Sequence, residues 1–258
     1  MQQYLFGDTE VAAQRLKVLA EVFAESTRAF VTSAVEARPQ LAVDLGCGPG
    51  YCTHLLAETL RAPRTVGLDN SEHFLALARQ TETENVSFCL HDVTSVPFPA
   101  APADLAYCRF LLSHLLEPRQ VVARWATQLR PKGLLLIEEV EAIHTTNRIF
   151  TEYLGIVEAL LADQLTSLYV GPVLAGLGND DACTRRSNQV KRLPVANHDA
   201  ARMFFLNLQS WKHKPFIQAN FGRQEMTRLE ASLCKMAHDL SGMVEIEWQL
   251  RQVTLEHS

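Results

Sequence analysis

The stretch Val43-Asp44-Leu45-Gly46-Cys47-Gly48-Pro49-Gly50 places three glycines directly after a short apolar run. The run, residues 41–45, is too short for a helix, and helical periodicity begins at residue 51. A glycine-rich turn between a strand and a helix lets the backbone approach a ligand where a Cβ would collide. In open α/β sheets, ligands bind beyond the carboxyl ends of the strands. The octapeptide therefore predicts a ligand site at the end of the first strand.

Short apolar runs alternate with helical patterns on both sides of the octapeptide. The run at residues 134–137 is apolar on both faces, which is typical of a strand covered on both sides. This alternation predicts a Rossmann-like, doubly wound α/β fold with right-handed crossovers. We predict strands at residues 41–45, 65–68, 86–90, 104–108 and 134–137, and helices at residues 10–37, 51–60, 71–81 and 118–130.

The alternation stops after residue 138, and longer helical patterns follow. We expect the outer strands to complete a mostly parallel, seven-stranded sheet and the helices to form cap insertions. Residues 1–258 are interpreted as one domain, with the ligand-binding core at 38–140 and the cap from 1–37, 141–170 and about 196–242. The later elements are predicted as helices at 145–165, from 171, at 200–208 and 225–239, and strands at 184–194 and 244–255.

Composition excludes several classes of protein. The net charge of −5 over 258 residues gives no basic field for a strong nonspecific grip on nucleic acid. No apolar run is long enough for a membrane span, and the first residues lack a signal-peptide pattern. The six cysteines form no Cys-x-x-Cys pair, and nothing has metal-ligand spacing. We expect a cytoplasmic protein with reduced thiols, no metal, no membrane and no nucleic-acid partner.

Two acids follow neighbouring predicted strands at the same edge of the sheet. Asp69 comes about 20 residues after the glycines, where a carboxylate can accept both hydroxyls of an adenosine ribose. Asp92 follows the third strand and could accept from an adenine amine. A dinucleotide site shares the turn and the ribose acid, but its third glycine or alanine would stand at position 51, which is Tyr51. A dinucleotide oxidoreductase is therefore the weaker interpretation.

On these residues the chain resembles class I S-adenosylmethionine-dependent methyltransferases, over about residues 41–139. The octapeptide matches the first motif of that family, Asp69 its ribose-binding acid and Asp92 its adenine-contacting acid. Residues 104–110 resemble the fourth-strand motif, and residues 129–137 resemble the turn and fifth strand common in small-molecule methyltransferases. The cap lies outside the resemblance.

The resemblance implies an S-adenosylmethionine pocket at the carboxyl edge of the sheet. Asp44 would approach the amino group of the methionine part, Asp69 and Asn70 would hold the ribose and adenine, and Arg109 would lie at the methionine end. The N-terminal segment often folds over the cofactor in this family, which makes Tyr4 and Arg15 candidates for its carboxylate. The expected cofactor-binding residues are Tyr4, Arg15, Asp44, Gly46, Gly48, Asp69, Asn70, Asp92, Val93 and Arg109.

Methyl transfer from a sulfonium depends mainly on alignment and a dry site, so a catalytic side chain is not required. If a base acts, His114 is the candidate, although a histidine among leucines is also a common packing residue. Glu138, Glu139 and Glu141 would favour an amine or guanidinium acceptor if they face the pocket, but we expect Glu139 and Glu141 to be solvated and only one carboxylate to point inward. The expected substrate-binding residues are Glu138, Tyr153, Tyr169 and Trp211.

The sequence thus predicts an enzyme of EC 2.1.1 type that methylates a small organic acceptor and releases S-adenosyl-L-homocysteine. The alternative is a protein that binds S-adenosylmethionine without methylating, such as a cyclisation or rearrangement catalyst, because a fold does not fix a reaction. The acceptor atom, the identity of the substrate and the oligomeric state stay open at this point.

Overall fold

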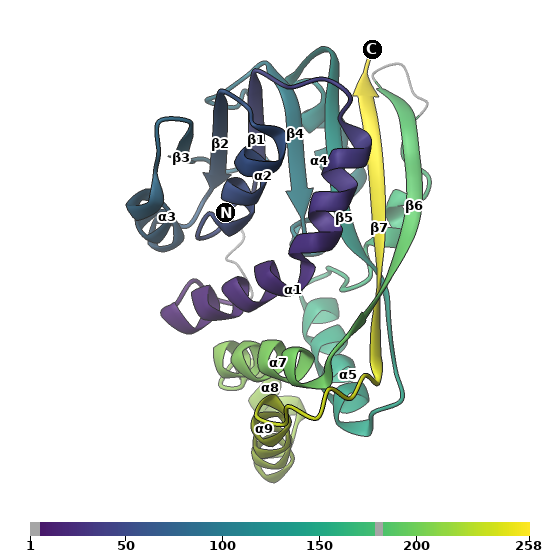
Figure 1. Cartoon of the computed structure of the whole chain (residues 1–258). Coiled ribbons are helices and arrows are strands. Elements are labelled where there is room, and N and C mark those ends of the chain that lie inside the picture. Colours follow the sequence, from purple (N-terminus) through teal and green to yellow (C-terminus); the bar gives the residue numbers. More distant parts are fainter. Residues whose placement is uncertain (1–5, 179–182) are drawn as a thin grey trace.

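The computed structural model describes residues 6–178 and 183–258, which contain one seven-stranded sheet in the order β3-β2-β1-β4-β5-β7-β6. Strands β1 to β5 pair in parallel, and β7 is antiparallel to β5 and β6. The predicted Rossmann-like, mostly parallel sheet is confirmed (Figure 1). The strands are β1 (Leu41–Leu45), β2 (Arg64–Asp69), β3 (Val86–Leu90), β4 (Ala103–Arg109), β5 (Leu129–Thr145), β6 (Cys183–Val195) and β7 (Ile246–His257).

The helices cover the sheet and its carboxyl edge. The predicted helix at 118–130 ends early, because residue 129 already begins β5, and the short α8 was not predicted. The helices are α1 (Glu10–Ala34), α2 (Tyr51–Leu60), α3 (Glu72–Ala78), α4 (Pro118–Ala126), α5 (Arg148–Asp163), α6 (Gly171–Leu174), α7 (Asn197–Trp211), α8 (Pro215–Asn220) and α9 (Arg223–Ala237), with 3₁₀ turns η1 (Arg79–Thr81) and η2 (Leu112–His114).

Strand β5 is much longer than the predicted run at 134–137. It spans 17 residues, and its second half pairs with β7 as far as Thr145. The following helix begins at Arg148, where the Asn147 Oδ1 atom accepts from the backbone N–H of Ile149 at 2.9 Å. The expected cap boundary at residue 141 therefore falls inside the sheet, because β7 supplies a partner strand that local periodicity cannot reveal.

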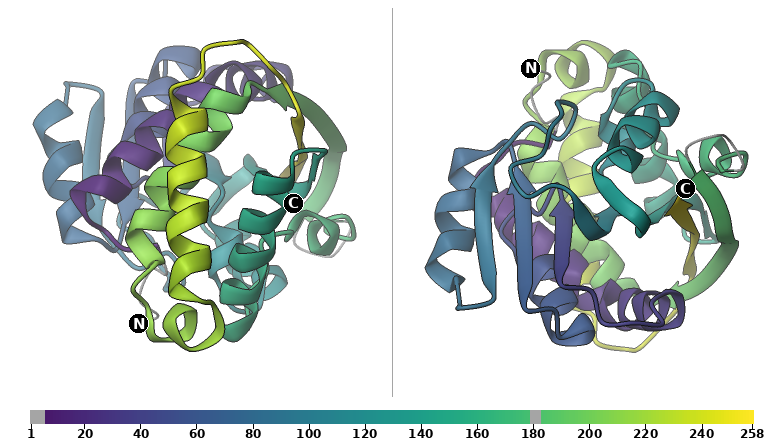
Figure 2. Two further views of the ribbon diagram at one scale, coloured as in Figure 1. Left: turned by 90° about the horizontal axis from the view of Figure 1, so that it is seen from below. Right: turned by 90° about the horizontal axis from the view of Figure 1, so that it is seen from above.

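The cap has a hydrophobic core of its own beyond the ends of the parallel strands. In Figure 1 these strands point toward α1, α5 and α7. Phe150, Trp211 and Leu229 are fully buried in one cluster that also takes in the ends of β5 and β7. Figure 2 shows α7 and α9 side by side, and Gln209 and Lys212 on α7 both donate to Glu230 on α9. Helices therefore cover the carboxyl edge of the sheet.

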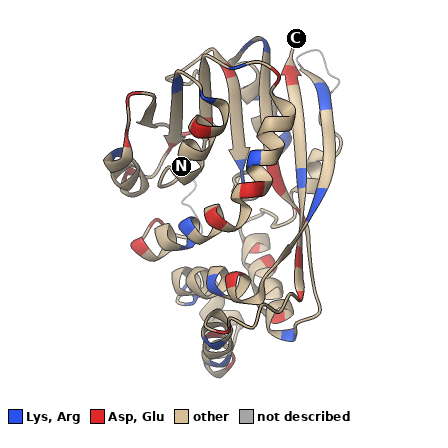
Figure 3. Ribbon diagram, viewed as in Figure 1, with Lys and Arg blue, Asp and Glu red and all other residues tan. Residues whose placement is uncertain are grey.

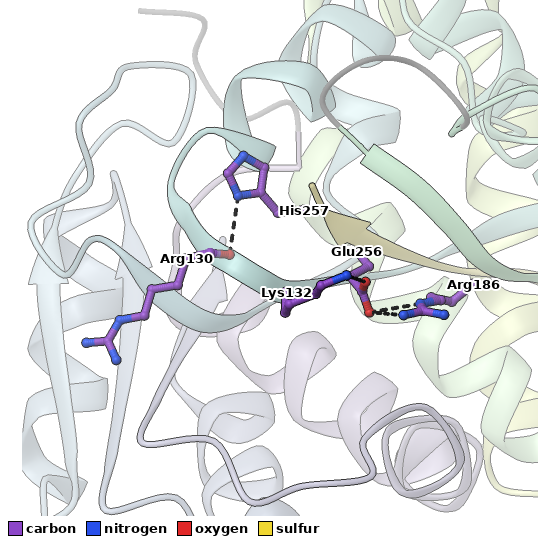
Figure 4. A network of polar contacts seen from close by, with 5 residues as sticks. All are labelled: Arg130, Lys132, Arg186, Glu256 and His257. Atoms are coloured by element: carbon purple, nitrogen blue, oxygen red, sulfur yellow. Dashed lines mark hydrogen bonds and ion pairs between the residues drawn. The ribbon is translucent and has the colours of Figure 1, made fainter.

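The opposite end of the sheet carries surface ion pairs. Glu256 on β7 accepts from Lys132 at 3.2 Å and from the Arg186 Nε atom at 2.8 Å, while His257 contacts the carbonyl of Arg130 (Figure 4). Basic and acidic residues are otherwise interspersed over the ribbon, with basic residues along the edge strand β6 (Figure 3). Exposed pairs of this kind contribute little stability. No helix in the described part of the chain is long and apolar enough to cross a membrane.

Candidate functional site

A cavity of about 250 Å³ lies where the carboxyl ends of the strands meet α1 and the cap. Its two ends are lined by different parts of the chain. The glycine end is formed by the segments after β1 and β2 and includes Asp44, Gly46, Cys47, Gly48, Cys52, Asp69, Asn70, Ser71 and Phe74. The aromatic end is formed by α1, the cap helices and the ends of β5 and β7 and includes Leu19, Phe23, Phe110, Val140, Ile143, Tyr153, Leu154, Val157, Met203, Phe204, Asn207 and Trp248.

The glycine loop holds a conformation that few other residues can adopt. Gly46 has φ +71° and Gly50 has φ +89°, both in the left-handed region. A Cβ on Gly46 would lie 2.8 Å from the Leu111 side chain, and one on Gly50 would lie 2.6 Å from the Phe88 ring. The spacing of glycines is therefore explained by both backbone conformation and close packing, and the loop stays open toward the cavity.

Asp69 joins the two loops at the glycine end. Its Oδ2 atom accepts from the backbone N–H of Gly48 and its Oδ1 atom from that of Ser71, each at 2.8 Å. Burial raises the pKa of this carboxyl, and the backbone hydrogen bonds oppose that shift. A carboxylate has about four acceptor positions. Asp69 can therefore hold the loops and still accept from a ligand hydroxyl, as predicted for the ribose.

Asp44 and Arg109 both line the cavity and lie close to each other. Asp44 accepts from the Thr53 hydroxyl at 2.7 Å, and burial raises its pKa to about 6, against the lowering effect of Thr53 and of the Arg109 charge. The Arg109 Nη1 atom donates to the Thr27 hydroxyl on α1 at 2.8 Å. One carboxylate and one guanidinium thus stand close to each other, a pattern suited to the ammonium and carboxylate of an amino acid.

Glu138 is not among the described residues that line the cavity, which corrects its predicted place in the substrate site. It is fully buried, and its carboxylate accepts from Thr27 at 2.6 Å, Gln252 at 2.7 Å and Tyr107 at 2.9 Å. A more distant donor is the Ser26 hydroxyl, at 3.2 Å. The side chain joins α1, β4 and β7, so its function in the fold is structural. Its link to the cavity runs through Thr27, which also holds Arg109.

Glu139 was expected to be solvated, and that expectation is wrong. Its side chain has no exposure, and its Oε1 atom accepts from the backbone N–H of Leu111 at 2.8 Å and of Leu112 at 2.7 Å. The carboxyl therefore fixes the segment after β4 that lines the cavity. Glu141 instead forms a two-point ion pair with Arg251 at 2.6 and 2.7 Å. None of these three glutamates of β5 lines the described cavity, as an amine site would require.

The buried Glu139 predicts a dependence of stability on pH. Burial raises its pKa from 4.5 to about 8, so between these values the unfolded chain holds fewer protons than the folded one. The free energy of unfolding then falls as pH rises through that window. We expect Glu139→Gln to reduce this fall, measured as urea midpoints from about pH 5 to 8. The exposed Glu58→Gln variant is the control, and parallel profiles for Glu139→Gln and the parent would contradict the assignment.

His114 lines the cavity from η2, as predicted, but its environment does not suit a base. Burial, with a smaller contribution from the Arg15 charge, lowers its pKa to about 3. The imidazole is therefore neutral at physiological pH and binds a proton weakly. Its ring packs edge-on against Phe6 with centroids 5.1 Å apart. The predicted general-base role thus gains no support from the electrostatics and stays a prediction.

Seven of the ten predicted cofactor residues and one of the four predicted substrate residues line the same cavity. Arg15, Asp44, Gly46, Gly48, Asp69, Asn70, Arg109 and Tyr153 all line it, the first seven being cofactor predictions.

 The predicted role of Arg15 at the cofactor rests on its position in the chain alone. The structure thus brings together residues that are far apart in the sequence.

Four further predicted residues do not line the described cavity, namely Asp92, Val93, Tyr169 and Trp211. Asp92 and Val93 are not among the described residues that line the cavity, and the Asp92 Oδ1 atom accepts from the backbone and hydroxyl of Thr94. The Tyr169 hydroxyl donates to Glu158 at 2.9 Å, and Trp211 is fully buried in the cap core. Neither aromatic residue is among the described residues that line the cavity, because Tyr169 turns toward Glu158 on α5 and Trp211 packs inside the cap core. Tyr4 lies outside the described residues.

Sequence reasoning missed most of the aromatic end. Phe23 and Trp248 are distant in sequence, yet their ring centroids lie 5.8 Å apart. Phe23 stands four residues after Leu19 and eight after Arg15, so all three occupy one face of α1 and line the cavity together. That spacing was the available signal. For Trp248 and Asn207 the sequence offered none, because their place depends on how β7 and α7 pack.

Comparison with known proteins gives an independent view of the same region. Residues 43–137 match the family described as a methyltransferase domain. A trans-aconitate 2-methyltransferase of Delftia acidovorans is 37% identical over 146 residues, which cover 52% of this chain and 54% of that protein. The chain thus spans about half the length of that curated relative. The predicted resemblance to class I methyltransferases is confirmed for the core of the sheet.

Solved structures extend the likeness to the whole fold. A coclaurine N-methyltransferase bound to N-methylheliamine and S-adenosylhomocysteine has a TM-score of 0.55 at 15% identity, covering 90% of this chain and 72% of that one. The plantazolicin methyltransferase in complex with S-adenosylhomocysteine has a TM-score of 0.54 at 13% identity, covering 96% of this chain and 90% of that one. At such identities the likeness concerns the fold alone.

Proposed function

We propose that this chain, whose residues 43–137 match a methyltransferase domain, transfers a methyl group from S-adenosylmethionine to a small organic acceptor. The single observation that carries the proposal is the continuous cavity, which joins the glycine end to the aromatic end under the cap. Cofactor and acceptor can therefore lie in one cavity. The trans-aconitate 2-methyltransferase relative also has a small molecule in its name, which supports an acceptor of that size.

The residues at the glycine end fit S-adenosylmethionine. The turn after β1 approaches the cavity with glycines where side chains would collide, as the 2.8 Å distance from a Gly46 Cβ to Leu111 shows. We propose that Asp69 accepts from the ribose hydroxyls, which is supported by the position of Asp69 and Asn70 in the cavity lining. Asp44 and Arg109 offer opposite charges for the ammonium and carboxylate of the methionine part. When bound, the cofactor supplies a methyl group that its positive sulfur already activates.

Such a transfer requires the protein to align the two reactants and to keep water away from them. Well-oriented reactants can gain roughly 7–11 kcal/mol of barrier lowering from alignment alone. The cap helices and α1 close the cavity, and Glu139 holds the segment after β4 in place through two backbone N–H groups. No feature of the described cavity favours the non-methylating alternative.

Two measurements test the proposal. Isothermal titration should detect binding of S-adenosylhomocysteine, and the ligand should raise the thermal unfolding midpoint, because it binds only the folded state. Radiolabelled methyl transfer from S-adenosylmethionine into small-molecule extracts should then give a labelled product. Absence of S-adenosylhomocysteine binding by correctly folded protein would remove the proposal.

We further propose a cytoplasmic location, supported by cysteines without Cys-x-x-Cys spacing.

A further inference from the structure

The aromatic end of the cavity is walled by a continuous series of rings. We call Phe23, Phe110, Tyr153, Phe204 and Trp248 the aromatic wall. Phe23 meets Phe110 with centroids 5.2 Å apart and Trp248 at 5.8 Å. Phe204 lies 5.7 Å from Trp248 and stacks on Tyr153 at 4.0 Å with an 18° angle between the planes. Such a wall, supplied by α1, α5, α7, β7 and the residue after β4, favours a flat, largely apolar ligand.

The charges around the cavity are unevenly distributed between its ends. Among the described lining residues the carboxylates are Asp44 and Asp69, both at the glycine end. Arg109 lies near Asp44, whose pKa its charge lowers. Arg15 is instead over the Phe6 ring, 5.3 Å from its centroid, and its charge reaches His114 and Tyr153. Away from the glycine end, the described lining residues therefore include the Arg15 guanidinium and no carboxylate. This charge favours an anionic acceptor.

A polar pair interrupts the aromatic wall. The Asn207 Nδ2 atom donates to the Tyr153 hydroxyl at 2.7 Å, and both residues line the cavity. Asn207 is 6% exposed, and its buried Oδ1 atom has no hydrogen-bond partner among the residues that the structure describes. A buried amide with one end unsatisfied is costly unless a ligand completes it. This pair gives the site a polar contact for a hydroxyl or N–H group on the acceptor.

We infer that the aromatic end binds a flat, largely apolar monocarboxylic acid, that Arg15 pairs with its carboxylate, and that the product is a methyl ester. The inference rests on the proposed methyl transfer. One carboxylate oxygen bonds to the methyl carbon, while the carbon–sulfur bond breaks and leaves its electron pair on sulfur. The negative charge of the acid and the positive charge of the sulfonium disappear together, so no proton has to move. A strong base is unnecessary, in agreement with the environment of His114.

This acceptor differs from a tricarboxylate. Three carboxylates in one buried site would need several cations, because each buried charge without a partner costs free energy. Arg15 can pair with one carboxylate, and the aromatic wall has no charged side chain for the others. We therefore expect trans-aconitate to bind more weakly than an aromatic monoacid, although the relative from Delftia acidovorans is named for trans-aconitate.

The first experiment uses the full-length protein saturated with S-adenosylhomocysteine. Cinnamate, phenylacetate and naphthoate are titrated by calorimetry, with their uncharged amides and trans-aconitate as comparisons. At least one monoacid should bind tenfold or more tighter than its amide and tighter than trans-aconitate. With labelled S-adenosylmethionine, the product of that acid should lose its label as methanol in alkali, as an ester does. Amides that bind as well as the acids, trans-aconitate as the tightest ligand, or no binding by any acid would overturn the inference.

Variants of Arg15 separate its role at the acceptor from one at the cofactor. Arg15→Gln should lower the affinity for the acid at least tenfold and remove the preference over the amide, while S-adenosylhomocysteine affinity changes less than threefold. Arg15→Lys should restore part of the preference. The matched control is Arg28→Gln, an exposed arginine on the same helix that pairs with Glu58. Loss of S-adenosylhomocysteine binding with an intact acid preference would assign Arg15 to the cofactor and refute the inference.

Failure of this inference is distinguishable from failure of the proposed function. Binding of S-adenosylhomocysteine to the parent protein is measured first and does not depend on the acceptor. If that ligand binds and the acids do not, the substrate class is wrong and the cofactor site stands. If it does not bind, both proposals fall.

Discussion

Replacing Asp69 with alanine is expected to weaken S-adenosylhomocysteine binding at least tenfold. The substitution removes the acceptor proposed for two ribose hydroxyls and also the two bonds from Gly48 and Ser71 that fix the loops at the glycine end. Hydrogen bonds to a charged group are worth about 1.5–3 kcal/mol each, and about 1.4 kcal/mol corresponds to tenfold in affinity. Isothermal titration of the folded variant measures the loss.

The matched control for Asp69 is Asp104, which lies at the amino end of β4. Its Oδ2 atom also accepts from two backbone N–H groups, those of Gln40 and Leu41, but it is not among the described lining residues. Asp104→Ala should therefore lower stability without changing S-adenosylhomocysteine affinity beyond twofold to threefold. Equal affinities for the Asp69 variant and the parent would remove the ribose assignment.

Replacing Glu138 with alanine is expected to give the largest loss of stability, about 3–5 kcal/mol. The substitution leaves the donors of Thr27, Tyr107 and Gln252 buried without their acceptor. It also releases the Thr27 hydroxyl that receives a hydrogen bond from Arg109, so S-adenosylhomocysteine affinity should fall as well. Urea unfolding at pH 7 measures the first effect and isothermal titration the second.

Two controls define the role of Glu138. Glu138→Gln keeps the shape and one acceptor, and should cost less than the alanine variant. Glu58→Ala removes a carboxylate that is 71% exposed, and surface changes of this kind usually stay within about 0.5 kcal/mol. A Glu138→Ala variant with a urea midpoint like that of Glu58→Ala would show that the buried network does not hold α1, β4 and β7 together.

The sheet was predictable because its signals are local. Each strand of the core is a short apolar run next to turn residues, and the order of runs and helices leaves few possible topologies. The glycine end was predictable for the same reason, since Asp44, the glycines and Asp69 all stand at the ends of such runs. The length of β5 was not predictable, because residues beyond 138 become strand through pairing with β7, more than 100 residues later.

The neighbouring glutamates of β5 show what local sequence patterns cannot predict. Glu138 and Glu139 are neighbours in the sequence, but successive strand residues point to opposite faces of a sheet. Glu138 meets α1 and Gln252 of β7, whereas Glu139 meets the backbone of Leu111 and Leu112. Neither partner can be identified from the residues beside them, so a cluster that suggested an amine site became two separate structural networks.

The amino-acid sequence by itself determined the α/β sheet, the glycine turn and the acids at its carboxyl edge, because those features depend on residues close together in the chain. Only the tertiary structure decided which side chains line the aromatic end of the cavity. There α1, α5, α7 and β7 bring Phe23, Tyr153, Asn207 and Trp248 around one cavity. These side chains meet through long-range packing, whose outcome depends on the whole core rather than on any local pattern.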